Sequence, residues 1–367
     1  MINIFSQCVY PAPYRVGVFN CLDAYDNINC FVAFEQEQGD KRNKNWFEKD
    51  FNFNYCFCKD KNIYKEELKK IKNKKYDIVM AYDYSSISSM RLLLKCIIHK
   101  IPYCINCDGA IIKRNFIKDK IKRFFIKHAR ACLANGKSAK NYFLTYGAKR
   151  ERIYMHKFTS LYEKDLIKDI IPKNEKEKFK KELGIKEKKV FLSIGSFIER
   201  KGFDILLEAI KSLNNKNIAF VIIGGGEKKE EYISYINENK LNNVYLKDFL
   251  NKNEITKYYD ASDVFIFPTR EDIWGLVINE AMSRGLPIIS TNMCMAATEL
   301  VDEKNGKIVG VDSVEELMRA IREFDLLSDS ELEKMGRISI ERNNNYTIEN
   351  IAKSHYRMVN EIYGEKN

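Results

Sequence analysis

Short apolar runs alternate with amphipathic segments along the first 145 residues of the chain. Five runs are predicted as strands, over residues 2–5, 30–33, 78–81, 103–106 and 131–134. A helical pattern lies between two of them, at 87–99, and another follows the last, at 139–145. Strands that alternate with helices predict a parallel sheet with helices on both faces, which makes the fold class α/β.

The same alternation returns in the second half of the chain. Strands are predicted at 190–194, 220–223, 244–246, 264–267 and 287–290. Helices are predicted at 203–213, 227–239, 276–283 and 314–324. The last segment, 348–363, places its apolar residues at helical spacing on one face.

A charged joint separates the two series. Residues 162–189 are dense in Lys and Glu and include Pro172, and part of this stretch, 175–183, is predicted as a solvated helix. The 367 residues suit two domains at roughly 100–200 residues each. We therefore predict domains over residues 1–170 and 186–346.

Composition narrows the class of protein only a little. No run reaches the roughly 18 apolar residues that span a bilayer, and the first residues lack the basic start and long apolar stretch of a secretory signal. We therefore expect a cytoplasmic protein. Cys104 and Cys107 form one CxxC pair without a second at zinc spacing, so we expect neither a metal site nor a disulfide framework.

The net charge of +11 permits an anionic partner, which could be nucleotide phosphates, nucleic acid or anionic lipid. The chain shows no recognised nucleic-acid-binding motif, and we expect no nucleic-acid partner.

The most informative stretch runs from Phe267 to Pro287. Seven residues separate Asp272, in the loop before a predicted helix, from Glu280 inside that helix. Glu280 shares the side of the helix that carries Leu276, so its carboxylate is predicted to face inward, where two ribose hydroxyls are suitable donors. The alternative is that Asp272 caps the helix and Glu280 pairs with a Lys or Arg.

The mouth of that helix suits a phosphate. Gly275 allows close approach of the backbone to a ligand, and the N–H groups of Gly275, Leu276 and Val277 have no partner within the helix.

Three further loops follow predicted strands. Residues 195–202 carry Arg200 and Lys201 between two glycines and can place a cation on a diphosphate, although an ordinary solvated loop is the alternative. Gly224, Gly225 and Gly226 permit a tight turn but are not the GxGxxG fingerprint. Residues 247–250 follow the next strand. In a doubly wound sheet all these loops meet at the carboxyl-terminal edge, where ligands bind.

These segments resemble the retaining nucleotide-sugar glycosyltransferases of family 4, also called group 1. The likeness rests on REDIWGLVINEAMSRGLP (270–287), with its acid–seven residues–Glu spacing, on ERKGFDILLEAI (199–210) and on residues 254–259. The resemblance implies the GT-B fold, with two Rossmann-like domains and a cleft between them. It also implies an acceptor-side first domain (1–170), a donor-binding second domain (186–346), and a terminal helix (347–367) that packs back onto the first.

The resemblance also implies roles for single residues. Glu280 would hold the donor ribose, Asp272 the donor sugar, with Glu271 the adjacent alternative, and Lys201 the diphosphate. The catalytic candidates are Asp272, Glu280, Lys201 and Asp108. The donor-binding candidates are Gly195, Ser196, Arg200, Lys201, Gly224, Gly225, Phe249, Leu250, Glu271, Asp272, Trp274, Gly275, Leu276, Val277 and Glu280.

The chain departs from the family pattern at three places. Ser196 stands where an Arg is frequent, Asp108 where a His is frequent, and the first acid is Asp272 rather than Glu. Asp108 either contacts the sugar or acceptor or forms an Asp-Gly turn with Gly109. The chain contains no DxD carboxylate pair, so we expect a metal-independent hexosyltransferase that needs no cofactor.

Two features of the first half concern the acceptor, which the resemblance predicts to be a cell-surface glycan or lipid-linked intermediate. Arg15 follows the first strand and could contact the acceptor or a phosphate. The alternative is a solvated side chain. Residues 111–130 hold eight basic residues and one acidic residue, interleaved with Ile and Phe. This pattern suits peripheral contact with an anionic membrane surface, while a core-facing helix with a solvated basic side is the alternative.

Two other readings of the whole chain stay open. One is a GT-B relative that binds a nucleotide without transferring a sugar, and the other is a basic nucleic-acid-binding protein.

Overall fold

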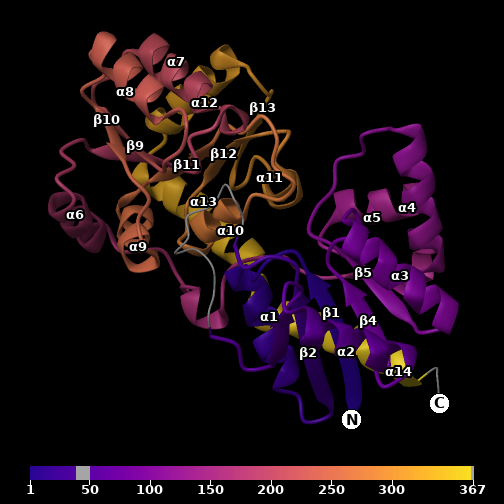
Figure 1. Cartoon of the computed structure of the whole chain (residues 1–367). Helices are drawn as coiled ribbons and strands as arrows, with labels where there is room; N and C mark the ends of the chain where they lie inside the picture. Colours follow the sequence, from indigo (N-terminus) through magenta and orange to yellow (C-terminus); the bar gives the residue numbers. More distant parts are fainter. Residues whose placement is uncertain (39–49, 365–367) are drawn as a thin grey trace. The chain divides into compact units, whose positions relative to one another are not determined.

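The computed structural model describes residues 1–38 and 50–364, which form two compact units (Figure 1). Unit 1 comprises residues 1–163 with 346–367, and unit 2 comprises 164–345. Residues 164–170, which the sequence assigned to the first domain, thus fall in unit 2. The final residues of the predicted terminal helix, 365–367, lie outside the described part.

Unit 1 is built on a seven-stranded parallel sheet of order β3-β2-β1-β4-β5-β6-β7. Its strands are β1 (Ile2–Cys8), β2 (Ile28–Phe34), β3 (Asn54–Phe57), β4 (Ile78–Ala81), β5 (Tyr103–Cys107), β6 (Ala131–Ala134) and β7 (Ile153–Met155). Ile4 of β1 pairs with Cys30 on one side and Ile78 on the other, which fixes the register at the centre of the sheet.

Six helices accompany this sheet among the described residues of unit 1. They are α1 (Pro13–Asp23), α2 (Lys61–Lys72), α3 (Ile87–His99), α4 (Phe116–His128), α5 (Lys137–Thr145) and α14 (Ile348–Gly364). The last of these packs on α1, and Met358, Val359 and Ile362 enter the same apolar cluster as Ile4 and Phe19. The yellow helix of Figure 1 therefore belongs with the indigo strands of the amino terminus.

Unit 2 is built on a six-stranded parallel sheet of order β10-β9-β8-β11-β12-β13. Its strands are β8 (Lys189–Ile194), β9 (Ile218–Ile223), β10 (Val244–Lys247), β11 (Val264–Phe267), β12 (Ile288–Thr291) and β13 (Gly306–Val309). Its helices are α6 (Lys173–Glu182), α7 (Phe203–Leu213), α8 (Lys229–Glu238), α9 (Lys252–Ala261), α10 (Leu276–Ser283), α11 (Met295–Leu300), α12 (Val314–Leu326) and α13 (Asp329–Asn343).

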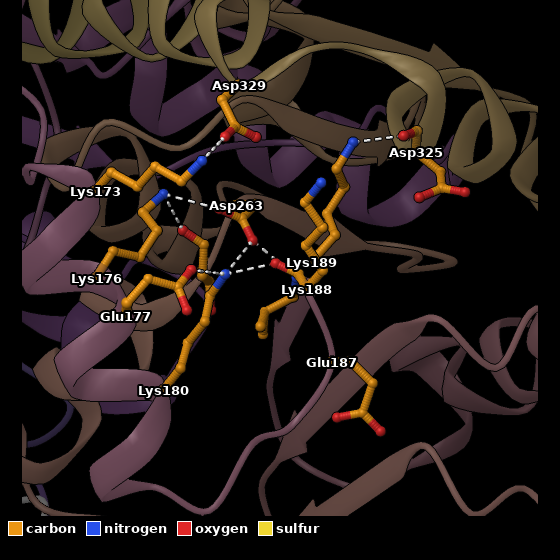
Figure 2. Close-up of polar contacts among 12 residues, drawn as sticks. Lys173, Lys176, Glu177, Lys180, Glu187, Lys188, Lys189, Asp263, Asp325 and Asp329 are labelled. Atoms are coloured by element: carbon orange, nitrogen blue, oxygen red, sulfur yellow. Dashed lines mark hydrogen bonds and ion pairs between the residues drawn. The ribbon is translucent and has the colours of Figure 1, made fainter.

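Lysine side chains fasten α6 to the amino-terminal edge of this sheet (Figure 2). Lys176 and Lys180 both donate to the carboxylate of Asp263, and Lys189 donates to the carbonyl groups at the end of α12. Lys180 is buried. The helix predicted as solvated therefore rests on the unit 2 sheet through its cationic side, and the ion pairs of Lys176 and Lys180 with Asp263 line a pocket of about 290 Å³ beside it.

Candidate functional site

The loops singled out in the sequence of unit 2 lie together at the carboxyl-terminal edge of its sheet. A Cβ on Gly224 would lie 1.9 Å from the carbonyl oxygen of Gly195, so the turns after β8 and β9 are in backbone contact. A Cβ on Gly225 would lie 3.0 Å from the ring of Phe249, which follows β10. Glycine is needed at position 224, because a side chain there would push the two turns apart.

Lys201 is the ordered cation of this edge. Its Nζ donates to Asp272 Oδ2 and lies 4.7 Å from the centre of the Phe267 ring. Both Lys201 and Asp272 are largely buried. Lys201 is therefore held in place by a carboxylate and an aromatic face, unlike the side chain of an ordinary solvated loop.

The neighbouring arginines are held differently. Arg200 donates to the carbonyl oxygen of Glu271 and lies 3.9 Å from Asp272, with about half of its side chain exposed. Arg270 instead clamps Asp204 and Asp312. Of the two, only Arg200 adds positive charge near the Lys201–Asp272 pair.

Asp272 is fixed by the backbone around it. Its N–H donates to the carbonyl oxygen of Met293 at 2.9 Å, and its Oδ1 accepts from the N–H of Trp274 at 3.2 Å. The N-cap of α10 is Gly275, without a side-chain cap. The alternative that Asp272 caps this helix is therefore wrong.

The start of α10 requires a glycine. Gly275 has φ of 98°, and a Cβ there would lie 2.7 Å from Cys294 Sγ. The indole of Trp274 is only 2% exposed and donates to Asn279 Oδ1 at 2.8 Å. This corrects one expectation, because the indole is buried, the N–H of Trp274 donates to Asp272 and its carbonyl accepts from Ala296, so Trp274 is a packing residue. Leu276 and Val277 form the first turn, whose N–H groups have no carbonyl within the helix.

Glu280 lies in the middle of α10 and is partly buried. Its Oε2 accepts a hydrogen bond of 3.0 Å from the hydroxyl of Tyr259 on α9. Sequence reasoning missed Tyr259 as a site residue, although it lies in the segment 254–259 that carried the resemblance.

In unit 1 the structure brings Arg15 and Asp108 together as an ion pair. Arg15 is buried, lies 4.0 Å from the centre of the Tyr82 ring, and is not the solvated side chain that was the alternative. Asn106 also donates to Asp108, at 2.6 Å. These residues follow or end parallel strands, so they mark the carboxyl-terminal edge of the unit 1 sheet.

Two histidines at this edge were not predicted as site residues. His156 follows β7, His355 lies on α14, and their ring centres are 5.5 Å apart. Burial lowers the pKa of His156 well below its ordinary value and that of His355 to about 4, so both rings are neutral near pH 7. Within the described residues, neither nitrogen of His156 has a hydrogen-bond partner, nor does Nε2 of His355. The signal for His355 was its place on the apolar face of the last helix.

Helix α4 exposes part of the basic segment 111–130. Phe125 and Ile126 point into unit 1, but Phe116 and Ile117 are 76% and 70% exposed, and Ile121 and Phe124 are exposed as well. The helix is therefore core-facing on one side and apolar as well as basic on the side toward solvent.

Metal and membrane-spanning features were sought across residues 1–38 and 50–364. No set of three or more His, Cys, Asp or Glu side chains there is arranged to hold a metal ion. Over the same residues, every helix is too short or too polar to cross a bilayer.

Comparison with known proteins shows what parts of this chain resemble. Residues 175–342 match the model of the glycosyl transferases group 1. The chain is 27% identical over 217 residues to the lipopolysaccharide glucosyltransferase WaaG of Escherichia coli (54% of this chain, 56% of WaaG). It is 30% identical over 159 residues to an uncharacterized glycosyltransferase of Haemophilus influenzae (41% of this chain, 42% of that protein). The alignments thus span about half the length of these curated relatives.

Solved structures extend the likeness to the whole chain at the level of the fold. A glycosyltransferase of Rickettsia africae aligns with a TM-score of 0.77 at 16% identity, covering 98% of each chain. HepE of Anabaena in complex with UDP aligns with a TM-score of 0.78 at 13% identity, covering 98% of this chain and 100% of HepE. The two parallel sheets are those of the GT-B fold, and residues 175–342, which make up most of unit 2, match the group 1 glycosyl transferases.

Proposed function

We propose that the protein transfers a sugar from a nucleotide-diphosphate sugar to an acceptor, with retention of configuration and without a divalent ion. The observation that carries the proposal is the carboxyl-terminal edge of the unit 2 sheet. There the largely buried Lys201 lies beside the start of α10, which has no side-chain cap. The carboxylate of Glu280 lies one turn inside that helix.

Each of these groups has a distinct role in the proposed reaction. Cleavage of the anomeric bond leaves negative charge on the departing diphosphate. The ammonium of Lys201 and the N–H groups of Leu276 and Val277 stabilise that charge. Asp272 contacts hydroxyls of the donor sugar, and Glu280 accepts hydrogen bonds from the ribose. Because Lys201 is already paired with Asp272, its ammonium is positioned before the donor arrives.

The relatives indicate the class of donor and acceptor. HepE is described in complex with UDP-glucose, WaaG as a lipopolysaccharide glucosyltransferase and WclY of Escherichia coli as an O-antigen biosynthesis glycosyltransferase. By this analogy the acceptor is a cell-surface glycan or lipid-linked intermediate. In unit 1, we assign Asp108 to contacts with the donor sugar or the acceptor, and the buried Arg15 to holding that carboxylate through its ion pair.

Binding of nucleotide sugars tests the donor site. Wild-type protein is titrated calorimetrically with UDP, GDP, dTDP and their glucose or mannose conjugates. Replacement Glu280→Ala is expected to weaken the best ligand about 10- to 100-fold, because it removes charge-assisted hydrogen bonds to the ribose. If the wild type binds none of these ligands, the donor assignment is wrong.

Turnover separates a transferase from a non-catalytic relative. Donor hydrolysis and transfer to lipopolysaccharide-type acceptors are followed by release of the nucleoside diphosphate. Nucleotide-sugar binding without any release favours the non-catalytic alternative, and binding to single-stranded oligonucleotides in place of nucleotide sugars favours the nucleic-acid alternative.

We also propose that α4 rests on an anionic membrane surface. Phe116 and Ile117 offer apolar side chains, Lys120 lies 4.2 Å from the Phe116 ring centre, and the flanking lysines and arginines supply the charge complementary to acidic lipid. A helix that is apolar and basic toward solvent gains from lying at the boundary between headgroups and acyl chains.

Vesicle sedimentation tests this contact. Vesicles that contain about one third phosphatidylglycerol are expected to bind the protein at low salt, and neutral phosphatidylcholine vesicles are not. The double replacement Phe116→Ser/Ile117→Ser should abolish retention. The matched control is Ile87→Ser on α3, an apolar residue that is 68% exposed. Equal retention of both variants would assign the exposed face of α4 to another partner.

A further inference from the structure

The carboxylate of Glu280 depends on a neighbour for its position. α10 is only eight residues long, and Glu280 is its fifth residue. Tyr259 on α9 donates its hydroxyl to Glu280 Oε2 at 3.0 Å. Tyr259 is 3% exposed, and its ring lies 5.9 Å from that of Phe265 on β11, so the donor itself cannot swing away.

The hydroxyl of Tyr259 acts only as the hydrogen-bond donor to Glu280. Burial, together with the charge of Glu280, raises the pKa of Tyr259 well above its ordinary value of 10. The hydroxyl therefore stays protonated and donates to the carboxylate throughout the physiological range. A neutral hydroxyl that donates to a carboxylate makes a charge-assisted hydrogen bond, which is stronger than one between two neutral groups.

A second polar link holds the same two helices together. Arg284, one turn after Glu280, donates from Nε and Nη2 to the two oxygens of Asp260, at 2.7 and 2.8 Å. Asp260 directly follows Tyr259 in the chain. Adjacent residues of α9 thus contact Glu280 on α10 and Arg284 at its C-cap, one turn later, and this spacing keeps the hydroxyl of Tyr259 opposite the carboxylate of Glu280.

The start of α9 is also fixed. Asn251 caps the helix and forms a capping box with Glu254, so α9 has a defined end on the side away from Tyr259. At the other side of α10, Asn279 exchanges hydrogen bonds with Asn343 of α13. The helix that carries Glu280 is therefore held from two directions, and the contact from α9 reaches the carboxylate itself.

We infer that Tyr259 is a positioning residue for donor binding. It occupies Oε2 of Glu280 and sets the rotamer in which the carboxylate meets the ribose hydroxyls. This inference rests on the proposed function, because it assumes that Glu280 binds the donor. Tyr259 does not itself contact the substrate.

The variant Tyr259→Phe removes one oxygen atom and keeps the buried ring. With the tightest nucleotide sugar of the UDP, GDP and dTDP panel as ligand, this variant is expected to raise Kd and KM about tenfold, with kcat within about twofold. The control is Tyr258→Phe, which removes a hydroxyl from the preceding residue of the same helix and should leave Kd unchanged.

A double-mutant cycle shows whether Tyr259 acts through Glu280. In the Glu280→Ala background, Tyr259→Phe should change Kd by less than about twofold, because the group it positions is gone. A tenfold loss that persists in that background, or a fall in kcat at constant KM, overturns the positioning role. Thermal unfolding of each variant confirms that the fold is retained.

The outcomes also separate this inference from the proposed function. If Glu280→Ala weakens donor binding but Tyr259→Phe does not, the donor site stands and the positioning role is wrong. If Glu280→Ala leaves donor binding unchanged, the proposed site is wrong and the positioning role is overturned with it.

Discussion

The carboxyl-terminal edges of the two parallel sheets have the same architecture and opposite chemistry. In unit 2 the edge carries Lys201, Asp272 and Arg200 on glycine-bounded loops, and its charges have partners. In unit 1 the edge is buried and aromatic, with two neutral histidines beside the Arg15–Asp108 pair. One fold thus supports an edge with positive charge on its loops and another in which polar groups lie in the interior.

The contrast extends to hydrogen bonding. Across the described residues, the buried side-chain nitrogen and oxygen atoms without a partner all belong to unit 1, on Ser6, Tyr82, Asn106, Asn135, His156 and His355. Each such atom costs about 1–3 kcal/mol. Unit 1 therefore holds polar atoms in its interior without a protein partner, whereas Lys201 and Asp272 at the candidate donor edge of unit 2 are partners of each other.

The largest expected effect concerns the buried ion pair of unit 1. Replacement Arg15→Met leaves the Asp108 carboxylate without its cation and is expected to destabilise the chain by about 3–5 kcal/mol. Urea unfolding measures the change. The control Arg337→Met breaks an exposed pair with Asp169 and should cost less than about 1 kcal/mol. If both variants lose less than about 1 kcal/mol of unfolding free energy, the buried Arg15–Asp108 pair does not distinguish unit 1 from unit 2.

The next effect is a pH dependence confined to unit 1. The pKa of His355 is about 4 in the folded chain, below its ordinary value of 6.5, so the unfolded chain binds the proton first as pH falls. Stability is therefore complete above pH 6.5 and declines by about 3 kcal/mol toward pH 4. Chemical unfolding between pH 4.5 and 7 measures the slope.

Two variants test the origin of that slope. His355→Leu should reduce the slope and leave the part that comes from His156, while His128→Gln, at an exposed position on α4, should not change it. An unchanged slope in His355→Leu would show that another group titrates.

In unit 2 the sharpest test is Lys201→Ala. Loss of a positioned cation at the departing diphosphate is expected to lower kcat about 100-fold. Steady-state release of nucleoside diphosphate provides the measurement. Lys211→Ala, on the exposed side of α7, is the matched control and should retain full activity. If Lys201→Ala keeps the full kcat, Lys201 does not stabilise the departing diphosphate, and the charge at this edge of unit 2 has no catalytic role.

The smallest effect separates backbone strain from crowding. Gly275→Ala forces a side chain into a left-handed conformation and against Cys294, with an expected loss of about 2–3 kcal/mol in thermal unfolding. Gly184→Ala meets the same conformational penalty in open space and should cost about 1 kcal/mol. If the two losses agree, contact with Cys294 adds nothing.

Much of the fold followed from the apolar pattern because most strands of both sheets are buried along most of their length. The strands that were missed are those without such a pattern. β3 reads as exposed at two of its four positions, β7 is nowhere fully buried, and β13 begins with Gly306. A short, half-exposed edge strand offers neither an apolar run nor a clear alternation, so only its pairing partner identifies it.

At the candidate site, the gathering of loops was predictable and their pairings were not. The rule for parallel sheets brings residues 195–202, 224–226 and 268–275 to one edge. The contacts Lys201–Asp272, Tyr259–Glu280 and Arg15–Asp108 join residues 71, 21 and 93 positions apart, and nothing local in the sequence specifies them. Trp274 shows the opposite error, since a motif position predicted to touch a ligand became a packing residue.

The return of α14 to unit 1 has a consequence for how the chain is made. A ribosome releases residues 1–163 first, but Met358, Val359 and Ile362 complete their apolar cluster only when the last turns emerge. Unit 2 consists of one continuous stretch, residues 164–345, and can complete its folding before unit 1 does. Premature termination before residue 348 would thus leave unit 2 complete. Unit 1 would expose the apolar surface that α14 covers, and chaperones and proteases recognise such surfaces.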